Sequence, residues 1–461
     1  MKSKYRRLFL KTLAAFSTLG AVPFYNKKLR AAELSNISII VVGSGVSGLA
    51  AAKSLAKMGA QVTVLEAKNR YGGRLYTDYS LGVPFELGAG WIHGASSKNP
   101  IKKLTDRIGA KTFVTDDDNQ VLFNSNGMPI SDADFDKLDE KWEEILEAVE
   151  NDVSHSDSRS LAKIIEEKFP GILSDLLIQW SLSAYTEFDK GAAIENLSAR
   201  YFNEDEAFPG VDVIVVDGFD KILKLLTDNL KLLLNTPVTK IVYGGNGVEV
   251  IAGGKKFTAD YVLCSVSLGV LKRKQIKFDP PLPNSYQRKI DKLGFGSVTK
   301  IAIKFSKAFW DPDVQYFSIA TETKGRWVIW LNYRTFSKQN ILLGISVGDY
   351  AITADKMNDK KLTADAIDAL KTVWGDTVGK PVKVLRTHWS TDFETLGAYS
   401  YPTPTSVPSD FDSLAEGISG SFYKTLFLCG EHTTFDYSGT LHGAYFSGVW
   451  AAELIAEEEE E

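Results

Sequence analysis

Three glycines and one acidic residue near the start of the chain are spaced as in a dinucleotide-binding site. Gly43, Gly45 and Gly48 form a GxGxxG loop, and Glu66 follows them in the sequence. The first glycine permits a tight turn, the second lets the backbone approach a pyrophosphate, and the third lets a helix pack closely on a strand. Glu66 could then accept hydrogen bonds from ribose hydroxyl groups. The four residues therefore predict a site for a dinucleotide.

The segments around these residues have the patterns of the elements that must position them. Residues 37–42 form a β-branched run that predicts a buried strand, and residues 61–65 predict a second strand that leads to Glu66. Between them, an Ala-rich amphipathic segment that extends to about Met58 predicts a helix, whose N-terminal N–H groups and dipole would face the phosphates. The order of these elements predicts a Rossmann-like α/β fold, but it leaves both NAD and FAD open.

One lysine lies in a segment that otherwise has the composition of a buried strand. Lys300 is surrounded by Val298, Ile301 and Ile303. One hypothesis is that alternation along the strand places Lys300 on a solvated face. The other is that Lys300 is buried, where loss of hydration would lower the pKa of its ammonium group. Because proteins seldom bury an ammonium without a use, the second hypothesis makes Lys300 a candidate for a reactive site.

Further motifs indicate which cofactor the glycine loop binds. Residues 70–74 contain a glycine pair followed by Arg74, and this segment resembles flavoproteins that bind FAD. Residues 86–94 and the Gly-Glu pair that ends residues 426–431 continue the resemblance. Over about residues 36–456 the chain resembles the flavin amine oxidase family, and within it the polyamine oxidases. The resemblance implies an FAD cofactor and oxidation of an amine by hydride transfer to the flavin.

The resemblance also implies roles for individual residues. Lys300 would hold a water beside the flavin N5 atom, Tyr399 would flank the substrate nitrogen, and His93 would contact substrate nitrogens. We take Glu187 as the candidate carboxylate that anchors a distal ammonium. No side-chain nucleophile is required, and the sequence has no metal-ligand spacing. The residues expected to contact FAD are Gly43, Gly45, Gly48, Glu66, Arg74, Gly90, Trp91, Val238, Trp389, Gly430, Glu431 and Thr440.

Two departures from monoamine oxidases narrow the resemblance. Ala398 occupies the position of the cysteine that bonds the flavin in those enzymes, and Thr440 occupies the position of their second active-site tyrosine. Both departures favour the branch that contains the polyamine oxidases and the histone demethylases, and they imply that FAD is held noncovalently. A histone demethylase is disfavoured by the export signal described below and by the lack of extra nucleosome-binding segments.

The resemblance implies two domains, which agrees with a length of 461 residues. One is a Rossmann-like FAD-binding domain built from segments that are not contiguous, and the other is an α+β substrate-binding domain. We expect the FAD-binding domain at 36–95, 206–297 and 396–456, the substrate-binding domain at 96–205 and 298–395, and an acidic tail at 457–461.

The first 32 residues have the features of an export signal. A basic start precedes an apolar stretch that is too short to span a bilayer as a helix. Arg6 and Arg7 lie in a segment that resembles the bacterial twin-arginine signal. The sequence therefore predicts a periplasmic or secreted protein with no stable membrane insertion once the signal is removed. Cys264 and Cys429 lie in apolar strand-like runs and are expected to be buried thiols.

The expected substrate is a small amine, most simply a polyamine, with an aldehyde, a shorter amine and hydrogen peroxide as products. A net charge of −5 disfavours nucleic acid as a partner. Other secondary or aromatic amines, including alkaloids, remain open as substrates. An L-amino-acid oxidase and a flavin-binding module without catalysis are further alternatives. The electron acceptor could be O2 or a cytochrome.

Overall fold

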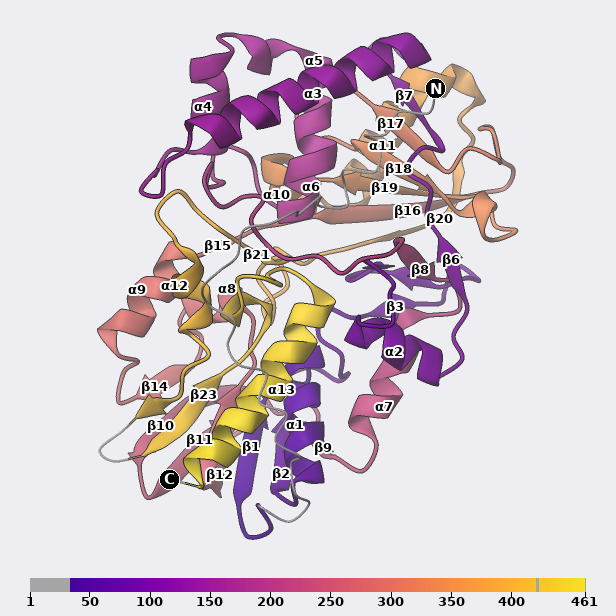
Figure 1. Cartoon of the computed structure of the whole chain (residues 1–461). Coiled ribbons are helices and arrows are strands. Elements are labelled where there is room, and N and C mark those ends of the chain that lie inside the picture. The colour runs from indigo at the N-terminus through magenta and orange to yellow at the C-terminus, as the bar shows by residue number, and fades with distance from the viewer. Residues whose placement is uncertain (1–33, 420–422, 461) are drawn as a thin grey trace.

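The computed structural model describes residues 34–419 and 423–460. The predicted export signal at 1–32 lies outside the described residues. The chain forms two domains, one built on a parallel sheet and the other on an antiparallel sheet (Figure 1). Segments far apart in the sequence make up each domain, as the colours in Figure 1 show.

The parallel-sheet domain has six strands in the order β22-β23-β13-β1-β2-β9. Neighbouring strands are parallel except β22, which pairs antiparallel with β23. The strands are β1 (Ser38–Val42), β2 (Gln61–Leu65), β9 (Lys231–Leu233), β13 (Tyr261–Cys264), β22 (Ile418–Ser419) and β23 (Lys424–Leu428).

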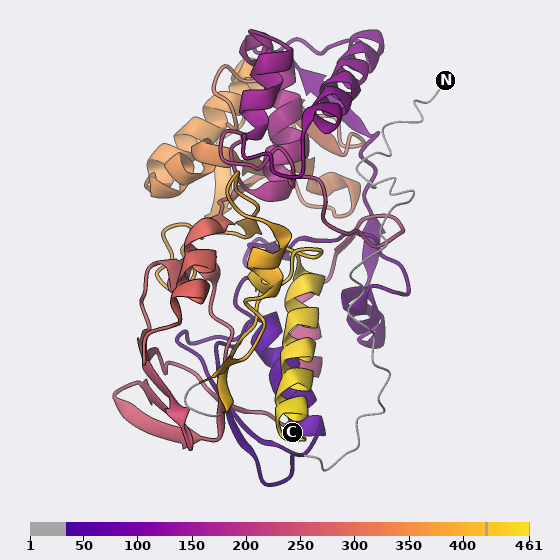
Figure 2. The same cartoon turned by 60° about the vertical axis from the view of Figure 1, so that its left-hand side comes forward.

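Both faces of this sheet are covered, which explains why its strands are apolar at successive positions. In β1, Ile39 and Val41 pack toward the helices α1 (Val46–Lys57) and α13 (Leu441–Glu458). Ile40 and Val42 pack toward a second sheet of order β12-β11-β10-β14, which lies on the other face (Figure 2). Its strands are β10 (Val238–Gly245), β11 (Gly247–Ala252), β12 (Lys255–Ala259) and β14 (Lys277–Asp279).

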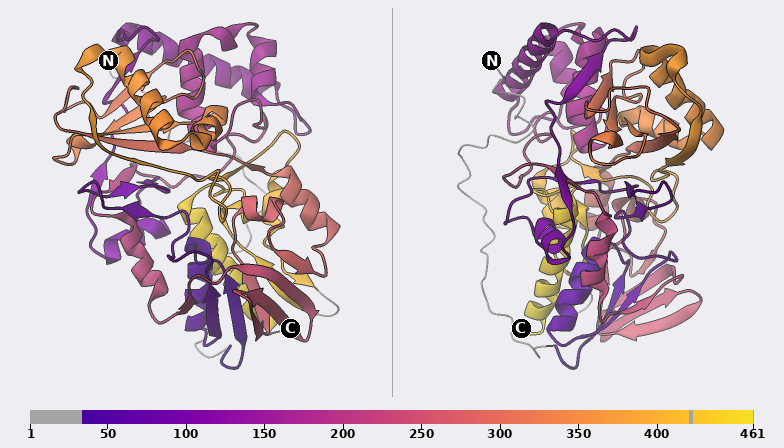
Figure 3. Two further views of the ribbon diagram at one scale, coloured as in Figure 1. Left: turned by 180° about the vertical axis from the view of Figure 1, so that it is seen from behind. Right: turned by 90° about the vertical axis from the view of Figure 1, so that its right-hand side faces the viewer.

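The antiparallel-sheet domain has the strand order β20-β16-β19-β18-β17-β7, and only β7 pairs parallel with its neighbour. Figure 3 shows this sheet from behind, across the end of the parallel-sheet domain. Its strands are β7 (Gln120–Phe123), β16 (Thr299–Phe305), β17 (Tyr316–Ile319), β18 (Ile329–Asn332), β19 (Ile341–Ser346) and β20 (Pro381–Arg386).

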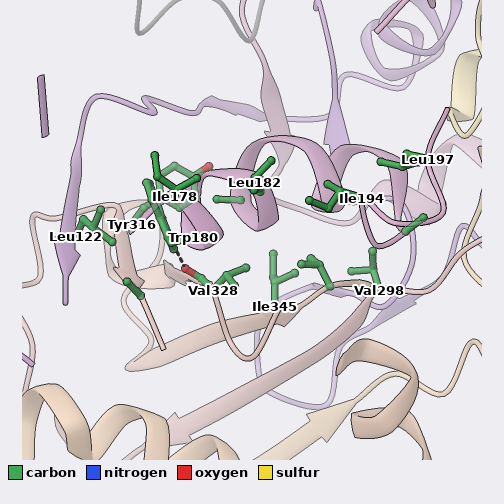
Figure 4. Close-up of a cluster of buried hydrophobic side chains, with 14 of the residues drawn as sticks. Leu122, Ile178, Trp180, Leu182, Ile194, Leu197, Val298, Tyr316, Val328 and Ile345 are labelled. Carbon is green, nitrogen blue, oxygen red and sulfur yellow. Dashed lines mark hydrogen bonds between the residues drawn. The ribbon is translucent and has the colours of Figure 1, made fainter. Parts of the chain in front are cut away.

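Helices cover both faces of the antiparallel sheet. On one face lie α10 (Gly348–Lys356) and α11 (Asp359–Trp374), against which Ile301 and Ile303 pack. On the other face Val298 packs with apolar side chains of the helical layer, and Trp180 Nε1 donates to the Val328 carbonyl at 3.1 Å (Figure 4). That layer contains α3 (Asp132–Asp152), α4 (Leu161–Lys168), α5 (Leu176–Ser181), a π-helical turn (Leu182–Glu187) and α6 (Phe188–Lys190).

Small sheets lie where the two domains meet. The pairs β3 (Thr77–Asp78) with β4 (Phe85–Glu86) and β15 (Gly294–Phe295) with β21 (Ser400–Tyr401) are antiparallel. A three-stranded sheet joins β5 (Trp91–Ile92), β8 (Val213–Val215) and β6 (Thr112–Val114). The remaining helices are α2 (Pro100–Arg107), α7 (Leu223–Thr227), α8 (Leu268–Lys272), α9 (Asn284–Lys292) and α12 (Pro408–Asp412).

Two contacts in the structure cross the domain boundaries that the sequence predicts. Strand β6 lies within the predicted substrate-binding segment 96–205, but it pairs with β8, which lies within the predicted FAD-binding segment 206–297. The acidic run assigned to a tail begins inside α13, and the Glu458 carboxylate accepts the Lys424 N–H at 3.0 Å. The domain limits otherwise stay a prediction.

The described residues can be compared with expectations about cysteines, membrane-spanning helices and metal sites. Cys264 and Cys429 are both buried free thiols, as predicted. Among residues 34–419 and 423–460, no helix has the length and apolar character needed to cross a bilayer. Within the same described ranges, no cluster of His, Cys, Asp or Glu is arranged to hold a metal ion.

Candidate active site

A cavity of about 1010 Å³ is lined by residues of both domains. Every predicted site residue lines it except Gly48 and Glu187. The predicted residues that it brings together are Gly43, Gly45, Glu66, Arg74, Gly90, Trp91, His93, Val238, Lys300, Trp389, Tyr399, Gly430, Glu431 and Thr440.

The glycine loop has the geometry that its spacing predicts. Gly43 has a φ of +96°, which a residue with a side chain rarely adopts. A Cβ atom on Gly48 would lie 2.2 Å from the Gly43 carbonyl oxygen, so only glycine allows this contact between loop and helix. A Cβ atom on Gly45 would meet no atom within 4 Å, because Gly45 borders the cavity. The loop therefore packs tightly against the helix at Gly48 and leaves space for a ligand at Gly45.

The N-terminus of α1 offers the cavity a site for an anion. Gly45 is the N-cap of α1 and makes no capping hydrogen bond through a side chain. Val46 and Ser47 of the first turn line the cavity. Uncapped N–H groups and the positive end of the helix dipole suit the phosphates of a dinucleotide. The residues present thus fit the pyrophosphate of FAD.

Glu66 lies at the end of β2, beside the glycine loop. Its carboxylate accepts the Ser44 N–H at 2.8 Å, the Ser44 hydroxyl at 2.7 Å and the Lys68 N–H at 2.9 Å. These bonds hold Glu66 at the wall of the cavity, near Val238 at the start of β10. Both residues are placed for the ribose and adenine end of a dinucleotide.

Arg74 and Glu431 form an ion pair on the wall of the cavity, in which Glu431 is buried and Arg74 is partly exposed. Arg74 Nη1 lies 2.8 Å from Glu431 Oε1 and donates to the Ala398 carbonyl at 2.6 Å. Glu431 Oε2 accepts the Ser400 hydroxyl at 2.6 Å and the Gly439 N–H at 3.1 Å. Burial raises the pKa of Glu431, but the charge of Arg74 and these hydrogen bonds outweigh burial and lower it. Glu431 therefore joins three separate segments as an ionised carboxylate.

Lys300 is buried at the cavity wall, with 6% of its surface exposed. Its ammonium donates to the Gly88 carbonyl at 2.6 Å and the Glu86 carbonyl at 3.2 Å, and it lies 5.6 Å from the centre of the Trp91 ring. Burial lowers the pKa of Lys300 to about 8, although the charge of Glu86 opposes this shift. A Cβ atom on Gly90 would lie 3.3 Å from Lys300 Nζ, so glycine leaves room for the ammonium. This outcome matches the hypothesis of a buried lysine.

Glu86 shares the buried region around Lys300. Its carboxylate accepts the Thr77 hydroxyl at 2.6 Å and the Phe219 N–H at 2.9 Å. Burial raises the pKa of Glu86 to about 7, and hydrogen bonds and the charge of Lys300 limit the rise. Two oppositely charged groups with pKa values close to neutral therefore lie next to each other. Sequence reasoning did not assign Glu86 a role.

Aromatic side chains line the cavity near Lys300. The Tyr399 hydroxyl donates to the Phe188 carbonyl, which holds the tyrosine ring in place. Trp91 meets the Phe188 ring edge-on, with the ring centres 6.1 Å apart. Trp389 Nε1 donates to the Leu87 carbonyl at 2.8 Å and so braces the segment that carries Glu86 and Gly88. Electron-rich ring faces of this kind attract cationic ligands.

His93 is held by a carboxylate that the sequence did not identify. Its Nδ1 atom lies 2.6 Å from Asp212 Oδ2, while Asp212 Oδ1 accepts the Gly94 N–H at 2.9 Å. The His93 side chain is 62% exposed, and it lines the cavity. The exposed surface of His93 faces the cavity, and the protein around the cavity desolvates the ring and so lowers its pKa. The hydrogen bond and charge of Asp212 outweigh this effect and raise the pKa. Asp212 thus sets both the orientation and the charge of His93.

Substitution of Asp212 by Asn is expected to raise KM about tenfold, because a hydrogen bond between charged groups contributes roughly 1.5–3 kcal/mol. The pKa of His93 should also fall, so the limb of the kcat/KM profile that reports His93 should move to lower pH. The measurement is a pH series of steady-state kinetics. Asp220→Asn is the matched control, since Asp220 bonds the Tyr79 hydroxyl outside the cavity. An unchanged profile in Asp212→Asn would contradict the assignment.

The structure does not support Glu187 as an anchor for substrate. Glu187 is fully buried and is not part of the cavity wall. Its carboxylate lies 3.1 Å from Lys324 Nζ and accepts the Ser183 hydroxyl at 2.9 Å and the Ile194 N–H at 3.0 Å. The π-helical turn directs Glu187 into this internal network, an orientation that spacing in the sequence does not reveal.

Other carboxylates line the cavity in its place. Four of them occupy one face of α3 at a spacing of three or four residues. Asp136, Glu140 and Glu144 have the same kind of spacing on this helix and do not line the cavity, so spacing alone does not identify the face. The others lie in segments outside α3, on loops except for Asp189 of α6, and these segments meet only in the folded chain. The α3 group is Asp139, Glu143, Glu147 and Glu150, and the second group includes Asp117, Asp189, Asp205, Glu206 and Asp212.

Comparisons with known proteins agree with this geometry. Residues 46–456 match the family described as flavin containing amine oxidoreductase. Probable polyamine oxidase 4 of Arabidopsis thaliana is 32% identical over 442 residues, which cover 90% of this chain and 86% of the relative. Polyamine oxidase 5 of Oryza sativa is 32% identical over 438 residues, which cover 90% of this chain and 87% of the relative.

Solved structures share the fold. Putrescine oxidase superposes with a TM-score of 0.74 at 19% identity, over 91% of this chain and 99% of the other. Cyclohexylamine oxidase from Brevibacterium oxydans has a TM-score of 0.74 at 21% identity, over 92% of this chain and 100% of the other. The match of the family across nearly the whole described chain identifies the cofactor as FAD. The chain therefore belongs to the flavin-containing amine oxidoreductase family, as an FAD-dependent enzyme that oxidises amines.

Proposed function

We propose that this enzyme oxidises a polyamine, with O2 as the electron acceptor. The observation that carries the proposal is the set of carboxylates along a cavity that also contains Lys300 and Tyr399. A polyamine carries several positive charges, so one of its nitrogens can react while the others contact carboxylates. Asp189 and Asp205 pair with Lys190, and Asp212 pairs with His93. The distal nitrogens of a polyamine would therefore meet Asp117 and the α3 carboxylates Glu143, Glu147 and Glu150.

The pKa values of the acidic residues support a cationic ligand. Burial and the charge of Glu140 raise the pKa of Glu143, and burial together with Glu204 and Glu147 raises that of Glu150. Burial and the charge of Asp212 raise the pKa of Asp117 to about 6. Carboxylates that repel one another gain stability when a cation lies between them.

The cofactor would be held without a covalent bond. The glycine loop and α1 would bind the pyrophosphate, Glu66 the ribose, and Arg74 with Glu431 the middle of the molecule. When bound, FAD supplies the acceptor for a hydride from the carbon beside the amine nitrogen. Ala398 offers no atom for attachment, and both described cysteines, Cys264 and Cys429, lie buried in the parallel-sheet domain.

Lys300 and Tyr399 are the side chains that would take part in the reaction. Tyr399 would hold the amine nitrogen in place while the neighbouring carbon gives up its hydride, and the aromatic walls would exclude bulk water. The Lys300 ammonium, which donates to two carbonyls, would hold a water with its remaining hydrogen. That water would attack the imine carbon, which gives an aldehyde and a shorter amine.

The proposal is tested by mixing the purified holoenzyme anaerobically with single amines and following the bleaching of flavin absorbance. The panel contains spermine, spermidine, their acetylated forms, tyramine, nicotine and tryptophan. Fast bleaching by a polyamine alone would support the proposal. Bleaching only by tyramine, nicotine or tryptophan would move the substrate class to a monoamine, an alkaloid or an amino acid, and no bleaching by any of them would overturn it.

A triple variant of α3, Glu143→Gln with Glu147→Gln and Glu150→Gln, is expected to raise KM for spermine about tenfold. Each charge that is lost removes roughly 0.5 kcal/mol of attraction at low ionic strength. The change in kcat should stay within about twofold, and KM for tyramine should change little. Steady-state kinetics at two salt concentrations measure the effect, which should shrink as salt rises.

The matched control lies on the same helix. Asp136→Asn with Glu140→Gln and Glu144→Gln removes the same number of charges from positions that are not part of the cavity wall. If both triple variants raise KM equally, the effect comes from the overall charge of the protein and the role of the α3 face is wrong.

Export by the twin-arginine route stays a proposal for residues 1–32. It rests on the basic start, the short apolar stretch and the Arg6-Arg7 pair. In cell fractionation, the wild-type protein should be found outside the cytoplasm, and a variant with Arg6→Lys and Arg7→Lys should be retained inside. Equal distribution of the two proteins would contradict the proposal.

A further inference from the structure

A second, smaller cavity lies against Lys300. Its volume is about 40 Å³, and it shares Gly90, Trp91 and Lys300 with the wall of the amine cavity. The volume admits one or a few molecules of the size of water, so an amine substrate cannot enter. The Lys300 side chain therefore borders two compartments of different size.

The wall of the small cavity is mainly apolar. Leu331 and Leu343 from the antiparallel sheet and Val215 from β8 contribute to it. Three polar groups of the wall have partners in the protein. The Glu86 carboxylate accepts from Thr77 and Phe219, the Ser337 hydroxyl donates to the Tyr333 carbonyl at 2.7 Å, and the Lys300 ammonium donates to the Gly88 and Glu86 carbonyls. A wall that is mainly apolar offers a water few hydrogen bonds and can take up small apolar molecules such as xenon.

The outer part of the small cavity approaches the protein surface. Val83, Val216 and Phe336 line it and are only half-buried, whereas Leu331 and Leu343 at the inner part are buried. None of these five residues lines the amine cavity. A small apolar molecule could thus reach Lys300 without passing a bound amine.

We propose that the small cavity is a holding site for O2 beside Lys300. This inference rests on the proposed use of O2 as electron acceptor. O2 is small and apolar, which matches the volume and the wall, and the Lys300 ammonium supplies positive charge where negative charge develops on oxygen. In the overall step, the reduced cofactor gives two electrons and two protons to O2, which yields hydrogen peroxide and oxidised cofactor.

The test uses two variants in which a larger side chain fills the small cavity, each in a different segment of the chain. In Val216→Phe and Val83→Phe, the larger side chain should occupy the space, and a crystal structure of each holoenzyme checks this. The reduced enzyme is then mixed with O2 in a stopped-flow instrument. We expect the second-order rate of flavin reoxidation to fall at least fivefold, with anaerobic reduction by amine within about twofold of wild type. Val382→Phe, which adds the same group at an exposed site on β20, is the control.

A measurement on the unaltered holoenzyme keeps the proposal testable if a filled variant does not fold. A crystal of the wild-type holoenzyme under xenon pressure should have xenon in the small cavity. Ordered water there instead of xenon would overturn the proposal. So would wild-type reoxidation rates in variants whose structures have the cavity filled.

The same measurements distinguish failure of O2 as the electron acceptor from failure of the holding site alone. If the reduced wild-type enzyme does not react with O2, both the use of O2 as acceptor and the holding site are wrong. If it reacts at a rate that filling the cavity leaves unchanged, O2 stays the acceptor and only the holding site is wrong.

Discussion

Replacement of Lys300 by Met is expected to slow the reoxidation of the reduced enzyme by O2 about 100-fold to 1000-fold. Removal of one group that stabilises developing charge in a buried site has an effect of this size. The methionine keeps the length of the side chain but removes the charge that the Gly88 and Glu86 carbonyls hold in place. Anaerobic reduction by amine should change much less. Stopped-flow measurement of the two half-reactions separates these effects.

A second lysine on the same strand supplies the control. Lys304 also lies on β16 and donates to a backbone carbonyl, that of Leu81 at 2.9 Å, but it does not line the amine cavity. Lys304→Met should reoxidise at the wild-type rate. Equal slowing in both variants would mean that damage to the sheet, and not loss of the Lys300 charge, is the cause.

The same assignment predicts a pH dependence. Because the pKa of Lys300 is lowered to about 8, its charged form dominates below that pH and is lost above it. The rate of reoxidation should therefore fall as pH rises through about 8 in the wild-type enzyme, and Lys300→Met should lack this step. A profile of the same shape in both proteins would assign the step to another group.

Replacement of Glu431 by Gln is expected to lower the free energy of unfolding by about 3 kcal/mol and to weaken FAD binding at least tenfold. Removal of one partner from a buried ion pair leaves the other charge without compensation, at a cost of about 3–5 kcal/mol. Here the unpaired group is Arg74, which is partly accessible from the cavity. Thermal unfolding and titration of the apoprotein with FAD measure the two effects.

The stability effect has a defined dependence on pH. The pKa of Glu431 is lowered in the folded protein, so its contribution is present above the unfolded pKa and disappears as pH falls through the folded pKa. The difference between wild type and Glu431→Gln should thus be largest near neutral pH and shrink below about pH 4. A constant difference across this range would contradict the ionised state of Glu431.

Glu187 is a matched control, since it is a buried carboxylate that pairs with Lys324 away from the cavity. Its pKa is raised because burial outweighs its partners, so neutral Gln should cost less stability there than at position 431. Glu187→Gln should keep the wild-type affinity for FAD. If it loses FAD to the same extent, the affinity reports general stability and not contact of the Arg74–Glu431 pair with the cofactor.

The sequence by itself determined the parts of the site that depend on local backbone geometry. A turn at Gly43 and close packing at Gly48 require residues without a side chain, and both requirements are visible in a few consecutive positions. The strand, loop and helix that surround them follow from hydrophobic pattern in the same way. The sequence could therefore place β1, the glycine loop and β2 with small errors.

The burial of Lys300 could not be predicted from such local patterns. Alternation along β16 places Lys300 on the face opposite Ile301 and Ile303, as the hypothesis of a solvated face assumes. Whether that face meets water depends on the segment of Glu86 and Gly88, which lies more than 200 residues away in the chain. Only the tertiary structure decided that this face is buried.

The contacts of the charged residues were decided in the same way. Asp212 meets His93 across 119 positions of sequence, and Glu187 turns to Lys324 and not to the cavity. No local pattern distinguishes a carboxylate that faces a cavity from one that faces an internal lysine, because burial and pairing depend on which segments pack against it. The sequence determined the cofactor-binding loop through backbone geometry, and tertiary packing decided which charges line the amine cavity.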